Sequence, residues 1–347
     1  MPISRKIMGV SRGRVFTGAL SNAGSYPLPS YLEGGSAVSP NSKQIYCKCV
    51  NGIQILQRNV STGALTTGTF FSIPTASEWC CVSPDGKHVY VCLSTNGNIR
   101  LYTRDLSTGE LTQGADYSSG VANIRKVEIS PDGNSIHTYK WNGVYVFQRN
   151  SSTGSLSYAY FYTTSNDTFR SLFSPDGLYY YNFGPYKELY IYSRIPATGQ
   201  LTLVANYNSG TANPAPNNDP RDACMTNDGL NIYVIGNYNV TQYSRNSTTG
   251  LMTNIADVAI PTTGYVQGGG RGCISSDNKH IYVGCVNTGY ITRFDRNTST
   301  GSLTYNSSLY LGSSTYYPLI IFTTPDGSNV YVENGNGLSS LNTLTRS

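Results

Sequence analysis

The stretch Ser83-Pro84-Asp85-Gly86-Lys87-His88-Val89-Tyr90-Val91 joins a tight turn to a strand-like run, and its first four residues recur along the chain. Proline presets φ at the second turn position, aspartate caps the turn locally, and glycine tolerates the geometry at the exit. Seven copies of this turn, intact or degenerate, begin at Ser39, Ser83, Ser130, Ser174, Thr226, Ser275 and Thr324. Their spacings of 44, 47, 44, 52, 49 and 49 residues indicate an internal repeat.

A second motif follows each of the first six turns, with an arginine five residues before the glycine of a Thr-Gly pair. These arginines are Arg58, Arg104, Arg149, Arg194, Arg245 and Arg296. The Thr-Gly pair supplies the positive φ that a tight hairpin needs. Because the arginine repeats in unit after unit, we interpret it as scaffold that bonds the Thr-Gly hairpin, and not as part of a functional site.

Each unit contains four strand-like runs: one before the first turn, one after it, one that ends at the arginine and one after Thr-Gly. Four strands in each of seven units, without helices, predict an all-β fold, a seven-bladed β-propeller of four-stranded blades. After the last turn only the runs 329–333 and 338–341 remain. Residues 17–21 match residues 62–66, so we expect the N-terminal segment to supply the missing strand and close the ring.

The predicted domain organisation is one propeller over residues 17–347, preceded by a basic N-terminal arm, residues 1–16. Charged residues make up only 12% of the 347 residues, and the net charge is +5. The first 32 residues contribute +4, through Arg5, Lys6, Arg12 and Arg14. The rest of the chain holds 24 − 4 = 20 bases against 19 acids. A body this close to neutral argues against nucleic-acid binding, which needs a dense basic face. The arm is the candidate contact to a protein partner in a larger assembly.

Neither a signal peptide nor a membrane span is evident: the apolar run 7–10 is too short for a secretion signal, and no run approaches ~18 apolar residues. We therefore expect a cytoplasmic or virion-associated protein. The eight cysteines lie in strand-like runs without a CxxC pair, which favours buried thiols over disulfides or zinc ligands. No GxSxG, HExxH or Walker motif occurs, and Gly268–Gly272 leads into a strand, so we expect no cofactor and no metal.

The repeats resemble those of the lactonase-like seven-bladed propellers, also called YVTN propellers, in the stretches 83–91 and 102–112. The resemblance covers residues 17–345 and implies the architecture. The family includes 6-phosphogluconolactonase-like and muconate-lactonising enzymes, whose active sites use His, Arg and Glu at the channel mouth, as well as propellers that only bind. Here His88, His137 and His280 lie in second strands, and none leads into a first strand, where a family-like catalytic histidine would be expected. Their placement disfavours lactonase chemistry.

Charged residues do precede the first strands. Four successive units place an arginine there, and acids occupy similar points; the residues are Arg125, Arg170, Arg221, Arg271, Glu33, Glu78 and Asp222. Repeat symmetry would gather them around one opening. One interpretation is a site for an anion or a sugar acid, because guanidinium groups bind carboxylates and phosphates in bidentate fashion. The other is a ring of charges that satisfy one another. Both interpretations stay open at this point.

Three connections between units differ most from the repeat: residues 206–222, 261–272 and 311–318. All three join a fourth strand to the next first strand, so they would lie on the same face as the arginines. They carry Tyr265, Tyr316 and Tyr317 among Asn, Ser and Gly, a composition shared with recognition surfaces. The alternative is ordinary variation of propeller loops.

We prefer the interpretation of a non-enzymatic propeller, a structural or protein/glycan interaction module such as a virion or extracellular-assembly component. The low charge, the abundant tyrosine and the lack of a catalytic constellation motivate it. One alternative is a lactonase-type hydrolase of a sugar lactone or a muconate-like acid, with Glu78 or Asp222 as base. The other is a glycan-binding module that uses the three loop tyrosines as stacking platforms.

Overall fold

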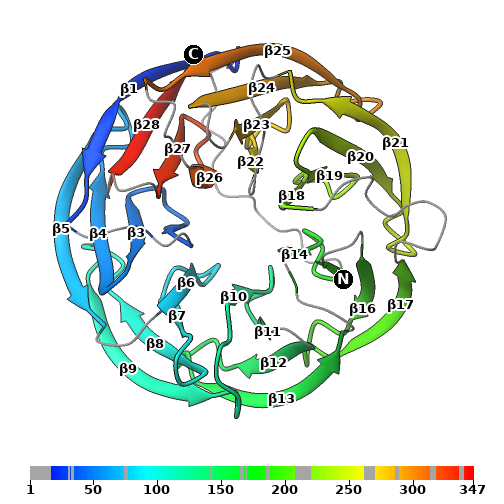
Figure 1. Ribbon diagram of the computed structural model, residues 1–347. Coiled ribbons are helices and arrows are strands. Elements are labelled where there is room, and N and C mark those ends of the chain that lie inside the picture. The colour runs from blue at the N-terminus through cyan, green and yellow to red at the C-terminus, as the bar shows by residue number, and fades with distance from the viewer. Residues whose placement is uncertain are drawn as a thin grey trace, which may run out of the picture.

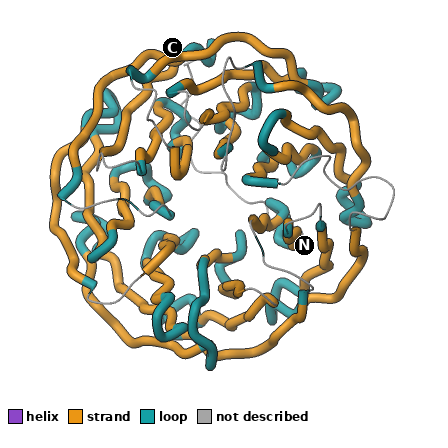
Figure 2. The backbone as a smooth tube through the Cα atoms, viewed as in Figure 1, coloured by secondary structure: helices purple, strands orange, loops and turns teal. Residues whose placement is uncertain are grey.

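The chain forms seven four-stranded antiparallel sheets arranged as blades around a central axis, as the repeat predicts (Figures 1 and 2). The computed structural model describes residues 17–29, 32, 35–73, 77–140, 143–164, 168, 170–184, 188–207, 220–261, 270–285, 289–312, 318–335 and 340–347. In the first six blades the four strands follow one another in sequence, from the innermost strand to the outermost. The predicted seven-bladed all-β propeller is confirmed.

We number the blades in chain order. Blade 1 contains β2 (Ala37–Val38), β3 (Gln44–Cys49), β4 (Gly52–Arg58) and β5 (Leu65–Ser72). Blade 2 contains β6 (Ser77–Val82), β7 (His88–Leu93), β8 (Asn98–Arg104) and β9 (Leu111–Ser118). Blade 3 contains β10 (Lys126–Ile129), β11 (Ser135–Lys140), β12 (Gly143–Arg149) and β13 (Leu156–Thr163). Blade 4 contains β14 (Arg170–Phe173), β15 (Tyr179–Phe183), β16 (Leu189–Arg194) and β17 (Leu201–Tyr207).

The remaining blades follow the same order. Blade 5 contains β18 (Asp222–Met225), β19 (Asn231–Ile235), β20 (Asn239–Arg245) and β21 (Met252–Ala259). Blade 6 contains β22 (Arg271–Ile274), β23 (His280–Cys285), β24 (Tyr290–Arg296) and β25 (Leu303–Tyr310). Blade 7 contains β26 (Pro318–Thr323), β27 (Asn329–Asn334) and β28 (Ser340–Arg346), and its outermost strand is β1 (Leu20–Pro27).

Strand β1 closes the ring by pairing with β28, so the first and the last strand of the chain lie in one blade, as predicted (Figure 1). The backbone N–H groups of Thr17 and Gly18 extend this contact by donating to the carbonyl of Ser347, at 2.6 and 3.1 Å. The third strand of this blade was expected at 338–341, and that boundary is wrong. It runs from Ser340 to Arg346, because it pairs along its length with both β27 and β1.

The repeated turn holds its shape through its own side chains. The hydroxyl of Ser83 donates to the carboxylate of Asp85 and accepts from the backbone N–H of His88, at 3.0 Å. The backbone N–H of Lys87 donates to the same carboxylate, at 3.0 Å. Gly86 takes a φ of +74°, which a residue with a Cβ rarely adopts. These bonds use up the polar groups of the turn and explain why Ser, Asp and Gly recur.

The recurrent arginine joins neighbouring blades, which corrects the expectation that it bonds its own hairpin. Arg149 donates from Nε to the hydroxyl of Tyr90 at 2.7 Å, and from Nη1 to the carbonyl of Gly133 at 2.9 Å. Its Nη2 lies 3.1 Å from the carboxylate of Asp85, in the turn of the preceding blade. Tyr90 in turn donates to the carbonyl of Gly154, at 2.7 Å. The tyrosine, and not the arginine, therefore bonds the Thr-Gly hairpin.

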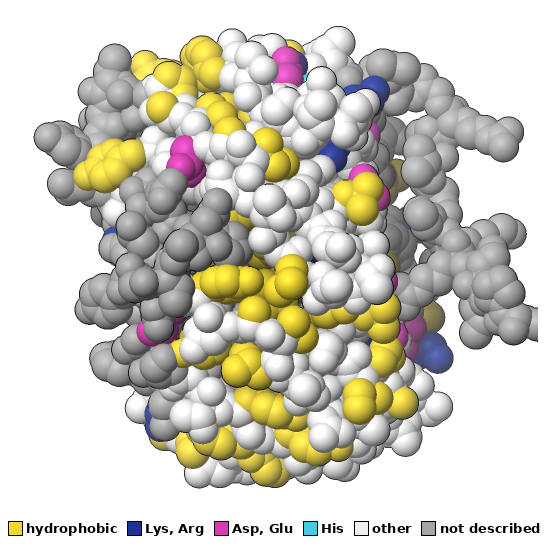
Figure 3. All heavy atoms as spheres, turned by 90° about the vertical axis from the view of Figure 1, so that its right-hand side faces the viewer, with side chains coloured by type: hydrophobic (Ala, Val, Ile, Leu, Met, Phe, Trp, Pro, Cys, Tyr) yellow, Lys and Arg dark blue, Asp and Glu magenta, His cyan; other side chains and the backbone are white. Residues whose placement is uncertain are grey.

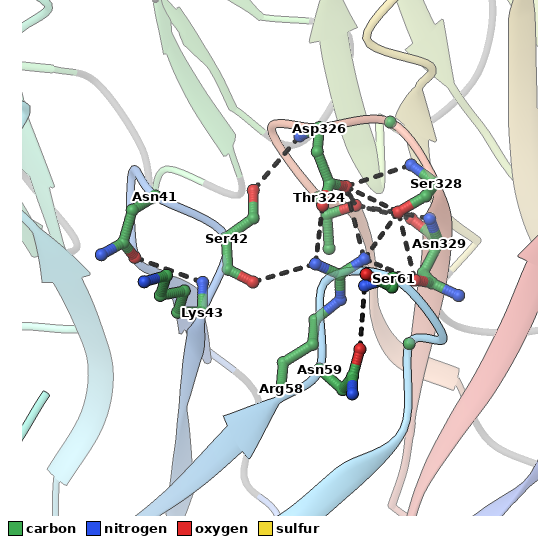
Figure 4. Close-up of polar contacts among 12 residues, drawn as sticks. Asn41, Ser42, Lys43, Arg58, Asn59, Ser61, Thr324, Asp326, Ser328 and Asn329 are labelled. Carbon is green, nitrogen blue, oxygen red and sulfur yellow. Dashed lines mark hydrogen bonds and ion pairs between the residues drawn. The ribbon is translucent and has the colours of Figure 1, made fainter. Parts of the chain in front are cut away.

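We call this set of contacts the clamp, and it recurs around the ring with a seventh arginine, Arg346. At two positions an amide oxygen is the partner of Nη2, with Arg104 bonded to Gln44 and Arg296 bonded to Asn231. Figure 4 shows the clamp where the ring closes, with Arg58 of blade 1 bonded to Ser42, Asp326, Ser328 and Asn329. Blade 3 departs from the pattern: His137 occupies the tyrosine position, and Nε of Arg194 has no hydrogen-bond partner within the described residues.

Hydrophobic clusters fill the seams between blades. The seam between blades 1 and 2, for example, contains the buried residues Tyr46, Ile53, Cys80 and Val89. All eight cysteines are free thiols, six of them buried and two partly buried. On the face shown in Figure 3, hydrophobic side chains cover broad areas among neutral groups, and charged side chains are few.

Candidate functional site

The candidate site is a layer of side chains at the N-terminal ends of the innermost strands. In each of five consecutive blades, one residue of this layer stands four positions before the Ser or Thr that begins the repeated turn. The residues are Trp79, Lys126, Arg170, Asp222 and Arg271, and they pair with Cys92, Tyr139, Phe183, Ile235 and Gly284 of the second strands. Blade 7 has Ile320 beside the corresponding second-strand residue, Glu333. The turn sets this register, so the layer follows directly from the repeat.

We call these five residues, together with Glu333 and Lys48, the inner layer. Some of its charged side chains contact a neighbouring blade. The guanidinium of Arg170 lies 2.8 Å from Asp222, from Nε to Oδ1. Asp222 is buried, and its two carboxylate oxygens accept hydrogen bonds from the backbone N–H of Ala223 at 2.9 Å and of Gly272 at 3.1 Å. Asp222 thus links blades 4, 5 and 6, and its occupied oxygens are poorly placed to accept a proton from water.

Blades 2 to 4 bring two cations to one aromatic ring. The Nζ of Lys126 lies 4.8 Å from the ring centroid of Trp79, and the Cζ of Arg170 lies 6.0 Å from it. Lys126 also contacts the carboxylate of Glu128, which accepts a hydrogen bond from the hydroxyl of Ser171. Burial and the neighbouring charge of Arg170 lower the pKa of Lys126 to about 8, although Glu128 opposes the shift.

The other predicted arginines are placed differently. Arg271 donates from Nη1 to the carbonyl of Arg221, at 2.8 Å. Arg221 stands one residue earlier in the register, and its Nε donates to Asn237 at 3.1 Å. Arg125 also stands one residue earlier, and its backbone N–H donates to the carbonyl of Tyr139 at 3.0 Å. Of the four predicted arginines, Arg170 and Arg271 therefore belong to the inner layer.

Several predicted residues lie outside the described part of the chain. They are Glu33, Tyr265, Tyr316, Tyr317 and the arm residues Arg5, Lys6, Arg12 and Arg14, together with the side chain of Glu78.

The inner layer contains charges that the sequence analysis missed. Glu333 and Lys48 are both 0% exposed. They occupy the fifth position of a second strand, where the other blades carry Cys92, Tyr139, Phe183, Ile235 and Gly284. Comparing this position across the seven repeats would have found them. The predicted set, drawn from residues before the first strands, also lacks Trp79, Lys126 and Glu128.

Glu333 has an unusual environment for a carboxylate. Its Oε1 accepts a hydrogen bond from the backbone N–H of Ser36 at 3.3 Å, and its Oε2 has no hydrogen-bond partner among the described residues. Burial raises the pKa of Glu333 to about 7, even though Ser36, Lys48 and Arg271 all act to lower it. A carboxylate with this pKa exists in both protonation states near neutral pH.

The three histidines belong to the blade seams. His88 accepts a hydrogen bond at Nδ1 from the clamp residue Arg149, at 2.7 Å, and His280 lies 3.0 Å from Asp295.

Within the described ranges, no three His, Cys, Asp or Glu side chains converge to hold a metal ion. The described part of the chain also has no helix long and apolar enough to cross a membrane.

Comparisons with known proteins connect this architecture to lactonases. Residues 76–168 match the family model described as lactonase, 7-bladed beta-propeller. The structure is similar to the periplasmic gluconolactonase of Pseudomonas aeruginosa, with 17% identity, a TM-score of 0.73, and 95% and 93% of the two chains covered. It is also similar to a proposed 6-phosphogluconolactonase of Bacteroides uniformis, with 19% identity, a TM-score of 0.71, and 82% and 85% covered.

The fold is not confined to proteins with lactonase names. Hydrazine synthase of Kuenenia stuttgartiensis is similar over 96% of this chain and 99% of its own, with 17% identity and a TM-score of 0.69. A search of curated proteins finds no match.

These comparisons correct the preferred interpretation of function. The family model and the gluconolactonase neighbours favour the lactonase-type alternative over a non-enzymatic structural module. They support neither a virion component nor a glycan-binding module. The placement of the three histidines in second strands is therefore not sufficient evidence against lactonase chemistry. The chain has the architecture of the lactonase-like seven-bladed β-propellers, and the resemblance stated from its repeats is confirmed.

Proposed function

We propose that the protein hydrolyses the lactone of a sugar acid at the inner layer. The observation that carries this proposal is the charge pattern of the layer, in which Lys126, Arg170 and Arg271 lie near the carboxylates Asp222 and Glu333 at one end of the central axis. The gluconolactonase and proposed 6-phosphogluconolactonase among the structural neighbours support the choice of substrate class.

Lactone hydrolysis makes two demands on a site. Negative charge develops on the carbonyl oxygen when water attacks, and a preorganised cation stabilises it. A base must also take the proton of the attacking water. Arg271 is suited to the first task, because its only hydrogen bond within the described residues uses Nη1, and its guanidinium carries five N–H donors.

Trp79 offers a flat apolar surface beside Lys126 and Arg170, and its ring is partly exposed. An aromatic ring of this kind packs well against the C–H face of a sugar ring, while the nearby cations suit its carboxylate or phosphate groups. Arg170 is held by its ion pair with Asp222, so it presents its charge at a constant position. Together these residues suit a sugar-acid lactone better than an uncharged apolar ester.

The test is the hydrolysis of glucono-1,5-lactone by the purified full chain, followed in a pH-stat against the spontaneous rate in buffer. We expect hydrolysis above that rate, and we expect Arg271→Ala to lower kcat/KM about 100-fold or more. Arg100→Ala is the matched control, because Arg100 pairs with Asp116 between β8 and β9, away from the inner layer. A wild-type rate equal to that of buffer would overturn the proposal, and muconolactone assayed in parallel separates the two lactone classes.

A further inference from the structure

A cavity lies at the outer part of the closing seam, between blades 7 and 1. Its volume is about 320 Å³, within the range of about 300–1,000 Å³ that is usual for small-molecule sites. The end of β1 and the two residues after it meet β4 and β5 here, and the lining residues are Tyr26, Pro27, Leu28, Pro29, Gln54 and Thr67. A hydrogen bond between the hydroxyl groups of Tyr26 and Thr67 crosses the seam, where the end of β1 lies beside β5 (Figure 1).

Gln54 is the buried polar side chain of this lining, only 2% exposed, and its orientation is fixed by its nitrogen. Nε2 donates to the carbonyls of Ile55 at 2.9 Å and Gly68 at 2.8 Å, and the carbonyl of Thr69 lies at 3.4 Å. These carbonyls surround the bulge between β4 and β5. Because only the amide nitrogen can donate to them, it cannot exchange places with the oxygen. Oε1 therefore faces the cavity, and it receives no hydrogen bond from any residue that the structure describes.

The repeat does not require this open acceptor. Gln54 stands four residues before the recurrent arginine, and in three other blades the side chain at that position contacts its register partner on the fourth strand. The pairs are Arg100 with Asp116, Tyr145 with Phe161, and Thr292 with Ser308. The partner of Gln54 is Phe70, which has no polar side-chain atom. Its ring lies over Gly52, with Cζ 2.8 Å from where a Cβ of that glycine would be. Blade 1 thus leaves the amide oxygen uncovered.

The lining defines the chemistry of a ligand. Among the described residues around the cavity none is charged, so an ion would lose its hydration there without gaining a counter-charge. Tyr26, Pro27 and Pro29 present rings, against which a flat apolar ring packs well. Oε1 of Gln54 only accepts, so the ligand must bring a donor. The hydrogen bond between Tyr26 and Thr67 uses one of their two hydroxyl protons, which leaves the other to donate. A group that both donates and accepts, a hydroxyl, matches this pair of demands.

We propose that this cavity, which we call the seam pocket, binds a small neutral phenol. The hydroxyl of the phenol donates to Oε1 of Gln54, and its ring packs against Tyr26 and the two prolines. A cavity of about 150 Å³ already holds benzene, so the seam pocket has room for a substituted ring. Blades 7 and 1 both contribute to the pocket, so a bound phenol stabilises the closed ring, as any ligand of the folded state alone does. The proposal does not depend on lactone hydrolysis at the inner layer.

The test titrates the full chain with phenol, followed by saturation-transfer difference NMR, and compares anisole, which has the same ring without the O–H donor. We expect phenol to bind with a Kd of about 1 mM, as suits so small a ligand, and anisole to bind about 5-fold more weakly or worse. Thr67→Phe should abolish binding, because Thr67 is exposed and a phenylalanine there can fill the pocket without disturbing the core. Gln113→Phe is the matched control, at the equivalent exposed position of β9, and should bind like wild type.

A second variant and a second readout keep the test decisive. Gln54→Leu should bind phenol and anisole equally well, because it removes the acceptor and keeps the apolar volume. If it fails to fold without the bonds of Nε2 at the bulge, Thr67→Phe decides the question alone. Phenol should also raise the urea midpoint of wild type and leave that of Thr67→Phe unchanged. The proposal is wrong if wild type shows no saturable binding up to about 10 mM phenol, if it binds phenol and anisole equally, or if Thr67→Phe binds phenol as wild type does.

Discussion

Replacing Arg58 with methionine tests whether the clamp holds the ring together at its closing seam. The side chain of Arg58 is 0% exposed and contacts Tyr331 at 3.0 Å, Ser42 at 2.9 Å and Asp326 at 2.7 Å. Methionine retains most of the aliphatic volume and removes every one of these bonds. Between blade 1 and the turn of blade 7, the hydrogen bond from the backbone N–H of Asp326 to the hydroxyl of Ser42, at 3.2 Å, would remain (Figure 4).

The magnitude follows from what each partner loses. Breaking a buried pair by removing one member costs about 3–5 kcal/mol when the remaining charge is buried. Here Asp326 is 30% exposed, so water replaces part of the lost contact. Tyr331 keeps its hydrogen bond to the carbonyl of Gly63, at 3.1 Å. We therefore expect Arg58→Met to lower the free energy of unfolding by about 3 kcal/mol, at the lower end of that range.

The assay is urea denaturation followed by circular dichroism, with Arg100→Met as the control. Arg100 and Asp116 form a partly exposed ion pair on the outer strands, and its loss should cost about 1 kcal/mol or less. A second control, Asp326→Asn, keeps a hydrogen-bonding group beside Arg58 and should fall between the two. An Arg58→Met variant as stable as Arg100→Met would refute the view that the clamp holds neighbouring blades together.

Three further predictions concern the clamps and the ring closure. The carboxylates of Asp85, Asp132, Asp176, Asp277 and Asp326 have lowered pKa values: burial opposes the shift, but hydrogen bonds from the turn and the clamp arginine outweigh it. These carboxylates stabilise the folded state fully above the unfolded pKa of about 3.8, and this stabilisation is lost as the pH falls through the lower folded values. Unfolding experiments should therefore show a steep loss of stability below about pH 4, and a flat profile from pH 5 to 3 would contradict this. The second prediction uses a Phe173→Ile background, in which β14 ends in isoleucine as β10 and β22 do. In that background His137→Tyr should be about 1 kcal/mol more stable than His137→Phe, because the tyrosine hydroxyl can accept a hydrogen bond from Nε of Arg194. Equal urea midpoints of the two variants would exclude that bond. Removing residues 1–27 should abolish cooperative unfolding and promote association through the exposed edge of β28, whereas a chain that starts at Thr17 should unfold like the full chain. If the protein without residues 1–27 is monomeric in size-exclusion chromatography and unfolds cooperatively in denaturant, the closure argument is wrong.

Most of the fold could be predicted from the sequence because turn chemistry is local. Ser83, Asp85 and Gly86 satisfy one another within a few residues, so the same four letters produce the same turn wherever they occur. Closure by residues 17–21 was also visible, because it repeats the hairpin of blade 1. The boundary of β28 was missed, since its extent depends on two partner strands and not on its own pattern.

The candidate site was predicted less well, for a reason rooted in strand register. Arg221 and Asp222 are adjacent in sequence, but successive residues of a strand point to opposite faces. One residue bonds Asn237 while the next pairs with Arg170 of another blade. A sequence search for charges near the strand starts finds both and cannot separate their roles. Such a search also misses Glu333, which lies in a second strand and joins this layer by pairing with Ile320; only a comparison of the fifth second-strand position across the repeats singles it out.

The sequence alone determined the repeat, its seven units, the turn and hairpin residues and the completion of the last blade by the N-terminus, because each rests on chemistry between residues close in the chain or on identity between units. Only the tertiary structure decided what the scarce charges do. Arginines of one repeated set meet aspartates and tyrosines of the preceding blade, and Lys126, Arg170, Asp222, Arg271 and Glu333 come from five different blades. Such contacts join residues roughly one or more repeats apart. Their burial and protonation depend on how the blades pack, and no local pattern encodes that.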